Sequence, residues 1–246
     1  MNKANKNLKV LISLPAYNEE VLIRQSAELL KSFCEENLKN YAWKIVVADN
    51  GSTDKTAEIA KELETENPGK IKYQLISKKG KGRAIRESWL ENDADIYAFM
   101  DADMATDLSA LPDLISSIED GFEVSAGSRF LKRSRAIRTF KRKITSLGYS
   151  WLVRMKFGLK IKDYPCGFKA VSRRAMDEIL PQIKNDTWFF DTEFLIRAAR
   201  KNFNIKEIPV KWQDKERDSK VNILKLIGEY MSELNRLKKD LTSTSN

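Results

Sequence analysis

The sequence predicts a single compact α/β domain in which helices flank a mainly parallel central sheet. Apolar runs alternate with helical patterns of about 10–15 residues through the first half of the chain, which is typical of parallel strands joined by crossover helices. The 246 residues, of which 42% are hydrophobic, suit one generous domain with a substantial core. No apolar run approaches the ~18 residues that a membrane-spanning helix needs, so we expect no such helix.

The first half contains four apolar runs that predict buried strands, over 8–14, 43–48, 71–76 and 96–101. Helical patterns separate these runs. The first extends to about residue 36, the second starts at the N-cap candidates Ser52, Thr53 and Asp54, and the third covers 83–91. Residues that follow parallel strands meet at one edge of the sheet, where α/β proteins bind ligands.

The second half is less regular. Its patterns predict strands over 122–128 and 205–212, helices over 144–157 and 190–201, and a loop over 163–168. Pro209 lies in the later strand and indicates an edge position, because proline cannot donate to a neighbouring strand. Near the C-terminus, one helical stripe predicts an amphipathic helix; it consists of Ile223, Ile227, Met231 and Leu234.

The positive charge is concentrated in one segment. The chain has 44 Lys and Arg against 35 Asp and Glu, a net charge of +9. Residues 124–162 hold twelve Lys or Arg and no acid, so the remainder of the chain is close to neutral. This basic segment is either a solvated face or a surface for a polyanion such as phosphates, anionic lipids or nucleic acid.

Other residue types limit the chemistry. The chain has no histidine, which excludes His-based triads, His-ligated zinc and an imidazole base. Cys34 and Cys166 lie far apart and suit neither a disulfide framework nor a zinc site. The N-terminal residues show no secretory signal. Catalysis is therefore expected to use carboxylates, Lys or Arg, hydroxyls, or a metal held by oxygen ligands.

The most informative cluster is Asp101-Ala102-Asp103, directly after a predicted strand. Alternate side chains of an extended segment share one face, so the two carboxylates can converge on one cation. Hard oxygen ligands suit Mg²⁺ or Mn²⁺, which also bind phosphate oxygens. Asp49 ends another predicted strand, and residues 17–19 follow the first. The basic side chains near this edge that could neutralise a diphosphate are Lys79, Lys81 and Arg83.

Seven motifs, in this order, resemble family 2 glycosyltransferases of the GT-A fold, which has a Rossmann-like sheet. They are LPAYNEE, VVADNGSTDKT, GKGRAI, FMDADMATD, GSRF, PCGFKAVSR and FDTEFLIRA, and they cover roughly Leu8 to Lys220. Within this family the sequence is most similar to dolichyl- or polyprenyl-phosphate glucosyl- and mannosyltransferases. The resemblance implies a glycosyltransferase domain over 1–220, with a nucleotide-binding half over 8–103, an acceptor half over 104–220, and a C-terminal helix and tail over 221–246.

The resemblance also assigns the donor residues. It implies that Asp49 bonds the base edge, that Asp101 faces the ribose or the 81–83 loop, and that Asp103 holds the metal, with Asp101 as its second carboxylate. The residues it implies for nucleotide binding are Pro15, Tyr17, Glu19, Asp49, Lys81 and Asp101. Asn50 stands where many relatives have a second Asp. Ala105 stands where some mannosyl enzymes have a metal-assisting Gln, which favours a glucose-type relative.

The acceptor side is assigned in the same way. The residues implied to grip the acceptor phosphate are Arg129, Arg142, Ser146, Arg217, Ser219 and Lys220. Asp163, Asp191 and Glu193 are implied to line the sugar side, and Trp188 could stack on a sugar. Arg142 is also counted among the catalytic residues, and the candidate bases are Asp103 and Asp191. An acceptor phosphate is already anionic near neutral pH, so a base is scarcely needed and the lack of histidine poses no difficulty.

The resemblance implies an inverting enzyme, dependent on Mg²⁺ or Mn²⁺, that moves a hexose from UDP-glucose, or next GDP-mannose, to a polyprenyl phosphate. We expect a peripheral protein at the cytoplasmic face of an anionic membrane. Many lipid-directed relatives have a transmembrane anchor, so an anchored partner subunit is a further expectation. One alternative is transfer to a soluble or glycan acceptor. The others are a basic nucleic-acid-binding module, which lacks a recognised motif, and a nucleotidyltransferase, which lacks a Gly-rich N-terminal loop.

Overall fold

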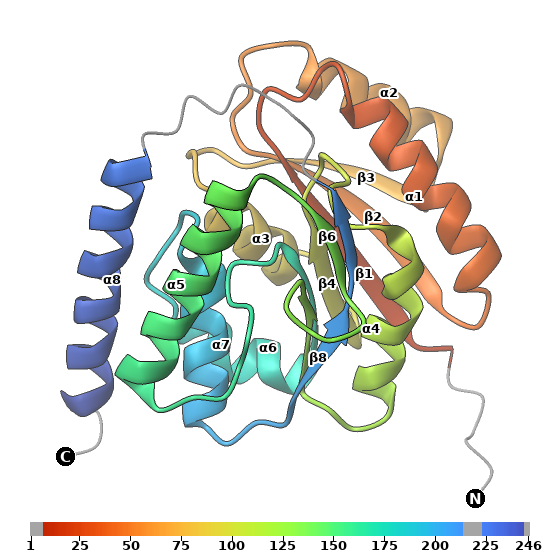
Figure 1. The fold of residues 1–246 in the computed structure, drawn as a ribbon. Coiled ribbons are helices and arrows are strands. Elements are labelled where there is room, and N and C mark those ends of the chain that lie inside the picture. Colours follow the sequence, from red (N-terminus) through yellow and green to blue (C-terminus); the bar gives the residue numbers. More distant parts are fainter. Residues whose placement is uncertain (1–6, 214–222, 244–246) are drawn as a thin grey trace, which may run out of the picture.

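We describe the protein from a computed structural model, which covers residues 7–213 and 223–243, without the side chains of 140–142 and 223–227. A seven-stranded sheet forms its centre, in the order β3-β2-β1-β4-β7-β5-β8 (Figure 1). A second sheet pairs β6 with β9. The strands are β1 (Lys9–Ala16), β2 (Ala42–Asp49), β3 (Ile71–Leu75), β4 (Ile96–Met100), β5 (Val124–Ser128), β6 (Arg135–Ile137), β7 (Phe168–Ser172), β8 (Ile205–Pro209) and β9 (Lys211–Gln213).

The helices lie on both sides of the large sheet. In Figure 1, α1 and α2 lie together near β2 and β3, and α5, α7 and α8 lie together at the other end. The α-helices are α1 (Ile23–Asn37), α2 (Thr56–Glu66), α3 (Lys81–Leu90), α4 (Leu111–Glu119), α5 (Phe140–Phe157), α6 (Arg173–Ile179), α7 (Phe190–Arg200) and α8 (Ile223–Ser243), with short 3₁₀ turns at Leu108–Ala110 and Leu180–Gln182.

The predicted mainly parallel sheet is confirmed. The first four strands form where apolar runs predict them, and β1 is parallel to both β2 and β4. Strand β7 is antiparallel to both of its neighbours, β4 and β5. Residues 168–172 and helices α4 and α6 were not predicted as elements. The edge position indicated by Pro209 is correct, because β8 is the last strand of the sheet.

Two cores lie against opposite faces of the sheet. Alternate residues of β1 point to different sides: Val10 and Ile12 belong to one core, and Leu11 belongs to the other. The second core contains α5, α7 and α8 side chains, among them Leu234 and Leu237 with no exposed surface. The C-terminal helix therefore packs on the sheet-covering helices, and the predicted stripe is buried at Leu234.

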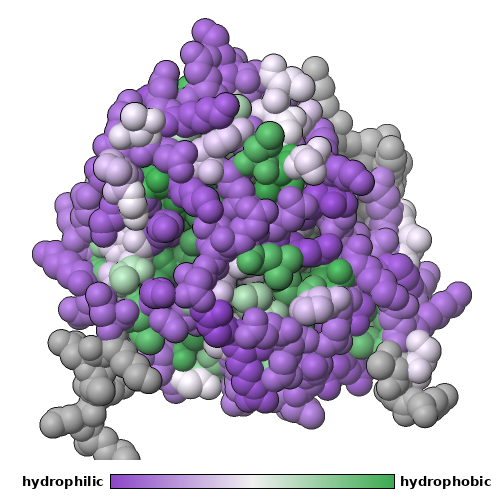
Figure 2. Space-filling model, turned by 180° about the vertical axis from the view of Figure 1, so that it is seen from behind, coloured by the Kyte–Doolittle hydropathy of each residue, from purple (hydrophilic) through white to green (hydrophobic). Residues whose placement is uncertain are grey.

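Two further observations concern the surface. Within the residues that the structure describes, no helix has the length and apolar character to cross a bilayer. The side of the molecule in Figure 2, seen from behind the view of Figure 1, is mostly hydrophilic with separate hydrophobic patches.

Candidate active site

The loops that follow β1, β2 and β3 are joined at the carboxyl edge of the sheet, which we define as the edge at which β1–β4 end. The backbone N–H of Asn18 donates to Ser52 Oγ over 3.0 Å, and the N–H of Thr53 donates to Asn18 Oδ1 over 2.8 Å. The N–H of Gly80 donates to Asn50 Oδ1 over 2.6 Å. These hydrogen bonds hold the polar ends of separate strands in one surface.

Asp49 is the last residue of β2 and is buried at this edge. Its Oδ1 accepts from the backbone N–H of Ser52 over 3.0 Å, and its Oδ2 accepts from the Tyr73 hydroxyl over 3.3 Å. Burial and the charge of Asp49 raise the pKa of Tyr73, so the hydroxyl keeps its proton. The carboxylate is therefore held in one orientation, with lone pairs left for a ligand.

The other predicted nucleotide-binding residues near β1 are half-buried; they are Pro15, Tyr17 and Glu19. The Nζ atom of Lys79 lies 3.6 Å from the centroid of the Tyr17 ring, a cation–π contact. The backbone N–H of Glu19 donates to Thr56 Oγ1 over 2.8 Å. The basic loop before α3 thus lies beside the first of these residues.

Four charged residues form a network beneath the carboxyl edge. Lys81 Nζ lies 2.6 Å from Asp101 Oδ1 and 3.4 Å from Asp191 Oδ2. Asp191 Oδ1 lies 2.7 Å from Lys169 Nζ, and the side chains of both residues are almost completely buried. Lys169 also donates to the carbonyl oxygen of Tyr164 over 3.1 Å. Two lysines therefore balance two aspartates that come from different parts of the chain.

This pairing determines the charge states of the network. Burial acts to lower the pKa of Lys81, but the carboxylates of Asp101 and Asp191 raise it above its ordinary value. Burial raises the pKa of Asp101, although Lys81 opposes the rise. Burial acts in the same direction on Asp191, yet Lys169 and then Lys81 hold its pKa below the ordinary value. Lys81 and Asp191 are therefore both ionised near neutral pH.

Two glycines permit this close packing. A Cβ atom on Gly167 would lie 2.1 Å from Asp101 Oδ2, which no side chain can do without displacing the carboxylate. A Cβ atom on Gly82 would lie 2.6 Å from the Cβ of Phe190, where α3 meets α7. The motifs PCGF and GKG therefore bring the network together by steric fit.

Asp103 follows β4 and is half-buried, and its Oδ1 accepts from the backbone N–H of Ala105 over 2.9 Å. In residues 7–213 and 223–243, no group of three or more His, Cys, Asp or Glu residues could hold a metal ion. The pair Asp101 and Asp103 provides hard carboxylate oxygens. These two residues fit Mg²⁺ or Mn²⁺ if a bound diphosphate supplies further oxygen ligands.

Arg129, a predicted acceptor-binding residue, is paired with a carboxylate of the protein. Its Nε and Nη2 donate to the two carboxylate oxygens of Asp163, each over 2.8 Å. Asp163 is fully buried, and Arg129 is nearly so. Burial opposes the charge of Arg129, but Asp163 raises its pKa above the ordinary value. The two predicted site residues thus bind each other, which sequence spacing does not reveal.

Glu193 is also paired within the protein. Its carboxylate lies 2.7 Å from Arg197 and 2.8 Å from Arg236 of α8, and it is fully buried. Trp188 is exposed, and Lys81 Nζ lies 5.1 Å from its ring centroid. The indole therefore lies at the mouth of the network, whereas Glu193 anchors α8 to α7.

The remaining predicted acceptor residues are only partly described. Ser146 is half-buried on α5. Arg142 lies in the first turn of the same helix, but its side chain is outside the described residues. Arg217, Ser219 and Lys220 also lie outside the described residues.

Two further residues at the site were not predicted from the sequence: one belongs to the network, and the other lies near it. Lys169 is in β7 and buried, and a lysine among the apolar residues of FKAVS is a signal that could have identified it. Tyr230 of α8 donates to the carbonyl oxygen of Trp188 over 3.4 Å, and the charge of Asp191 contributes to its raised pKa after burial. No local pattern indicates that α8 reaches this site.

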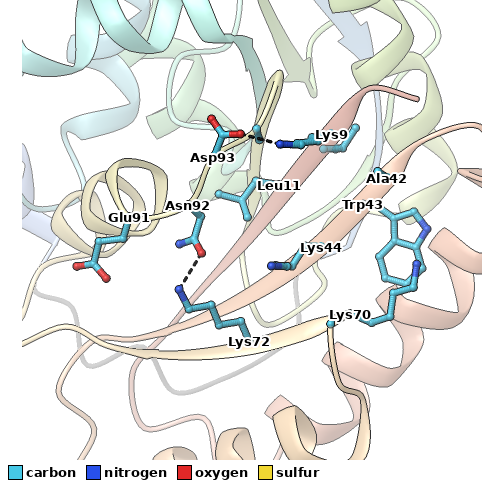
Figure 3. A pocket seen from close by; sticks show the side chains of 13 residues that line it. Lys9, Leu11, Ala42, Trp43, Lys44, Lys70, Lys72, Glu91, Asn92 and Asp93 are labelled. Carbon is cyan, nitrogen blue, oxygen red and sulfur yellow. Dashed lines mark hydrogen bonds and ion pairs between the residues drawn. The ribbon is translucent and has the colours of Figure 1, made fainter. Parts of the chain in front are cut away.

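A separate hollow of about 620 Å³ lies where β1, β2 and β3 begin, at the edge opposite to the candidate site (Figure 3). Lys9 pairs with Asp93 over 2.9 Å, and Lys72 donates to Asn92 over 2.9 Å. Trp43 lines the hollow, and its ring makes a cation–π contact with a further lysine. Because the predicted site residues follow the strands, none of them lines this hollow.

A mainly parallel sheet with two aspartates after its central strand, β4, is the arrangement expected of a GT-A glycosyltransferase. Residues 12–180 match the model of the family described as "Glycosyl transferase family 2". The chain belongs to this family and is an enzyme.

Three curated relatives illustrate the similarity. The chain is 34% identical to glycosyltransferase AglD of Haloferax volcanii, over 89% of this chain and 35% of that protein, so it spans about a third of that relative. It is 34% identical to the dolichyl-phosphate beta-glucosyltransferase of Saccharomyces cerevisiae, over 87% of this chain and 70% of that protein. The human dolichyl-phosphate beta-glucosyltransferase is 29% identical to it, over 86% of this chain and 68% of that protein.

Solved structures share the fold. Glucosyl-3-phosphoglycerate synthase from Mycobacterium tuberculosis in complex with UDP superimposes with a TM-score of 0.71 at 18% identity, over 94% of this chain and 80% of that chain. The same enzyme has been solved with Mn²⁺, UDP and phosphoglyceric acid, with a TM-score of 0.66 at 17% identity. At this identity the likeness concerns the fold alone.

Proposed function

We propose that this enzyme is an inverting, metal-dependent glycosyltransferase that moves a hexose from a nucleotide sugar to a polyprenyl or dolichyl phosphate. The observation that carries the proposal is the carboxyl edge, where residues after β1, β2 and β4 meet beside a network of lysines and aspartates. The names of two relatives, both dolichyl-phosphate glucosyltransferases, support the acceptor class and favour UDP-glucose over GDP-mannose as donor.

The nucleotide is proposed to bind along the first half of the sheet. Asp49 is held by Ser52 and Tyr73 and would accept a hydrogen bond from the base edge. Tyr17 would lie against the base or ribose, with Pro15 and Glu19 beside it. Lys79 and Lys81 are close enough to this edge to neutralise a diphosphate, which is the main requirement for its departure.

Asp101 and Asp103 would hold Mg²⁺ or Mn²⁺. When bound, the metal supplies positive charge to the diphosphate and so makes it a better leaving group. In the protein without ligands, Lys81 Nζ lies 2.6 Å from Asp101 and balances its charge. On donor binding, this lysine is free to turn towards the diphosphate, because Lys169 still balances Asp191.

The acceptor phosphate would attack the anomeric carbon with an anionic oxygen, and the bond from that carbon to the diphosphate would break. Arg142 and Ser146 on α5 are proposed to hold this phosphate, together with Arg217, Ser219 and Lys220. Asp191 is ionised, buried and bound to two lysines. This favours a role for Asp191 in positioning Lys81 over a role in proton transfer. Arg129 would contribute mainly by fixing the loop that contains Asp163.

A lipid acceptor places the enzyme at a membrane. We propose a peripheral location at the cytoplasmic face of an anionic membrane, in keeping with the twelve basic residues of 124–162. An anchored partner subunit is compatible with this location, and nucleic acid is not a proposed partner.

Transfer assays with radiolabelled sugar nucleotides and extracted lipids test the proposal. Incubation with UDP-glucose and Mg²⁺ should move label into the organic phase, and Asp103→Asn should remove nearly all of this transfer. GDP-mannose tests the second donor. Label that stays in the aqueous phase on a glycan or small molecule would contradict the lipid acceptor, and no transfer from any sugar nucleotide would contradict the activity.

A further inference from the structure

Helix α5 carries an exposed apolar stripe. Ile144, Leu147, Trp151 and Met155 are 54%, 39%, 56% and 68% exposed. Their spacing of three, four and four residues puts them on one side of the helix. The opposite side is buried, as Ser150, Val153 and Phe157 show, and it packs into the core between the sheet and α7. The stripe therefore has no function in holding the described fold together.

No other described element has a comparable surface. The remaining large hydrophobic residues that are well exposed are spread over separate elements; they are Val21, Leu29, Leu75, Leu90, Ile137 and Trp188. Single exposed hydrophobic residues are ordinary on protein surfaces, whereas four in a row along one helix indicate an interaction surface. In Figure 1, α5 is on the outside of the molecule beside α8, away from α1 and α2.

The segment that contains the stripe is strongly basic. It lies within residues 124–162, which contain twelve Lys or Arg and no acid. The exposed cations of this segment are Lys132, Arg133, Arg135, Lys143, Lys160 and Lys162. A second copy of this surface would be repelled by like charge, whereas an anionic bilayer would attract it. An apolar stripe with a tryptophan among cationic residues is the pattern of a helix that lies in the membrane interface.

We propose that α5 docks the enzyme on an anionic lipid bilayer, with Ile144, Leu147, Trp151 and Met155 inserted among the headgroups and upper acyl chains. The proposal deepens the proposed function and rests on it for the lipid acceptor. Arg142 and Ser146 lie at the beginning of this helix, so docking would bring the proposed phosphate-binding residues to the depth at which a lipid phosphate resides.

Vesicle flotation without any substrate tests the docking directly. The full chain should float with vesicles of phosphatidylcholine containing about one third phosphatidylglycerol, and much less with phosphatidylcholine alone. Trp151→Glu should weaken binding to the anionic vesicles by about tenfold or more, because it removes an interfacial aromatic group and adds a repelled charge. Met155→Glu should act in the same direction. Leu29→Glu, at a residue 52% exposed on α1, is the matched control and should bind like the wild type.

The outcomes separate docking from catalysis. Equal binding of Trp151→Glu and wild type, equal loss in Leu29→Glu, or equal flotation with neutral vesicles would each overturn the proposal. Unchanged thermal unfolding and UDP affinity of Trp151→Glu would support it by showing that the fold and donor site are intact. If the wild type floats as expected but transfers no sugar to lipid, the proposed function fails and the docking surface stands.

Discussion

The two halves of the large sheet bring polar residues to the site by different means. On the β1–β4 side, Asp49 ends β2 and Asp103 lies in the loop after β4. Their hydrogen bonds within the protein come from loop N–H groups and, for Asp49, from the Tyr73 hydroxyl, and not from a cation. On the β5–β8 side, charged residues neutralise one another: Arg129 with Asp163, and Lys169 with Asp191. A carboxylate with spare lone pairs can bind a ligand, whereas one fully occupied by a buried cation mainly holds the structure.

The largest expected effect tests the structural side of this comparison. Asp163→Ala should lower the free energy of unfolding by about 3–5 kcal/mol, because it leaves the Arg129 charge buried without a partner. Urea unfolding of both proteins measures the loss. Asp93→Ala is the control, since Asp93 is 65% exposed and pairs with Lys9 and Arg173 at the surface, and each exposed pair contributes about 0–1 kcal/mol. Similar losses in the two variants would contradict the distinction.

The ligand-binding side is tested by Asp103→Asn, which should reduce sugar transfer in Mg²⁺ or Mn²⁺ by about a hundredfold or more while the thermal unfolding curve stays near wild type. The expected size is that of removing one electrostatic stabiliser of the transition state. Asp107→Asn is the matched control, because Asp107 is exposed on the same segment and only caps a 3₁₀ turn through Ser109. Retention of more than about a tenth of the activity would remove Asp103 from the metal site.

The same difference between the two halves of the sheet explains which parts of the structure could be predicted from the sequence. Strands β1, β2 and β4 are mostly buried apolar runs, and the residues after them are polar, so both these elements and their shared edge follow from local patterns. The predicted parallel arrangement is confirmed for these strands, since β1 is parallel to both β2 and β4. Asp49 and Asp103 could therefore be placed from the sequence alone.

The second half depends on contacts between distant segments. The partners Arg129 and Asp163 are 34 residues apart, and Glu193 and Arg236 are 43 apart. No periodicity links such residues, so Arg129, Asp163 and Glu193 were predicted as site residues and not as members of pairs, and Arg236 was not predicted. Strand β7 was overlooked for a related reason: it has five residues, carries the buried Lys169, and is fixed by its antiparallel pairing with β4 and β5.

Arg142→Ala tests whether the basic segment serves the acceptor. We expect the KM for a short polyprenyl phosphate to rise by about tenfold or more, with UDP affinity unchanged, because a charge-assisted bond to phosphate contributes about 1.5–3 kcal/mol. Steady-state kinetics with the acceptor varied measure this change. Arg133→Ala, at an exposed position of the same segment, is the control and should have a small effect that moderate salt removes. A fall in nucleotide affinity in Arg142→Ala would place the segment on the donor side.

The smallest effect concerns the hydrogen bonds that orient Asp49. Asp49→Ala should weaken UDP binding by about 1–3 kcal/mol, because a base-edge donor would lose its acceptor in a buried site. Tyr73→Phe is the graded control: it removes only the 3.3 Å hydrogen bond to Asp49 Oδ2 and leaves the Ser52 N–H in place, so it should cost less than Asp49→Ala. Isothermal titration of UDP into each variant measures both changes. An unchanged affinity in Asp49→Ala would remove this residue from the donor site, and an equal loss in the two variants would mean that Tyr73, and not the carboxylate, contacts the nucleotide.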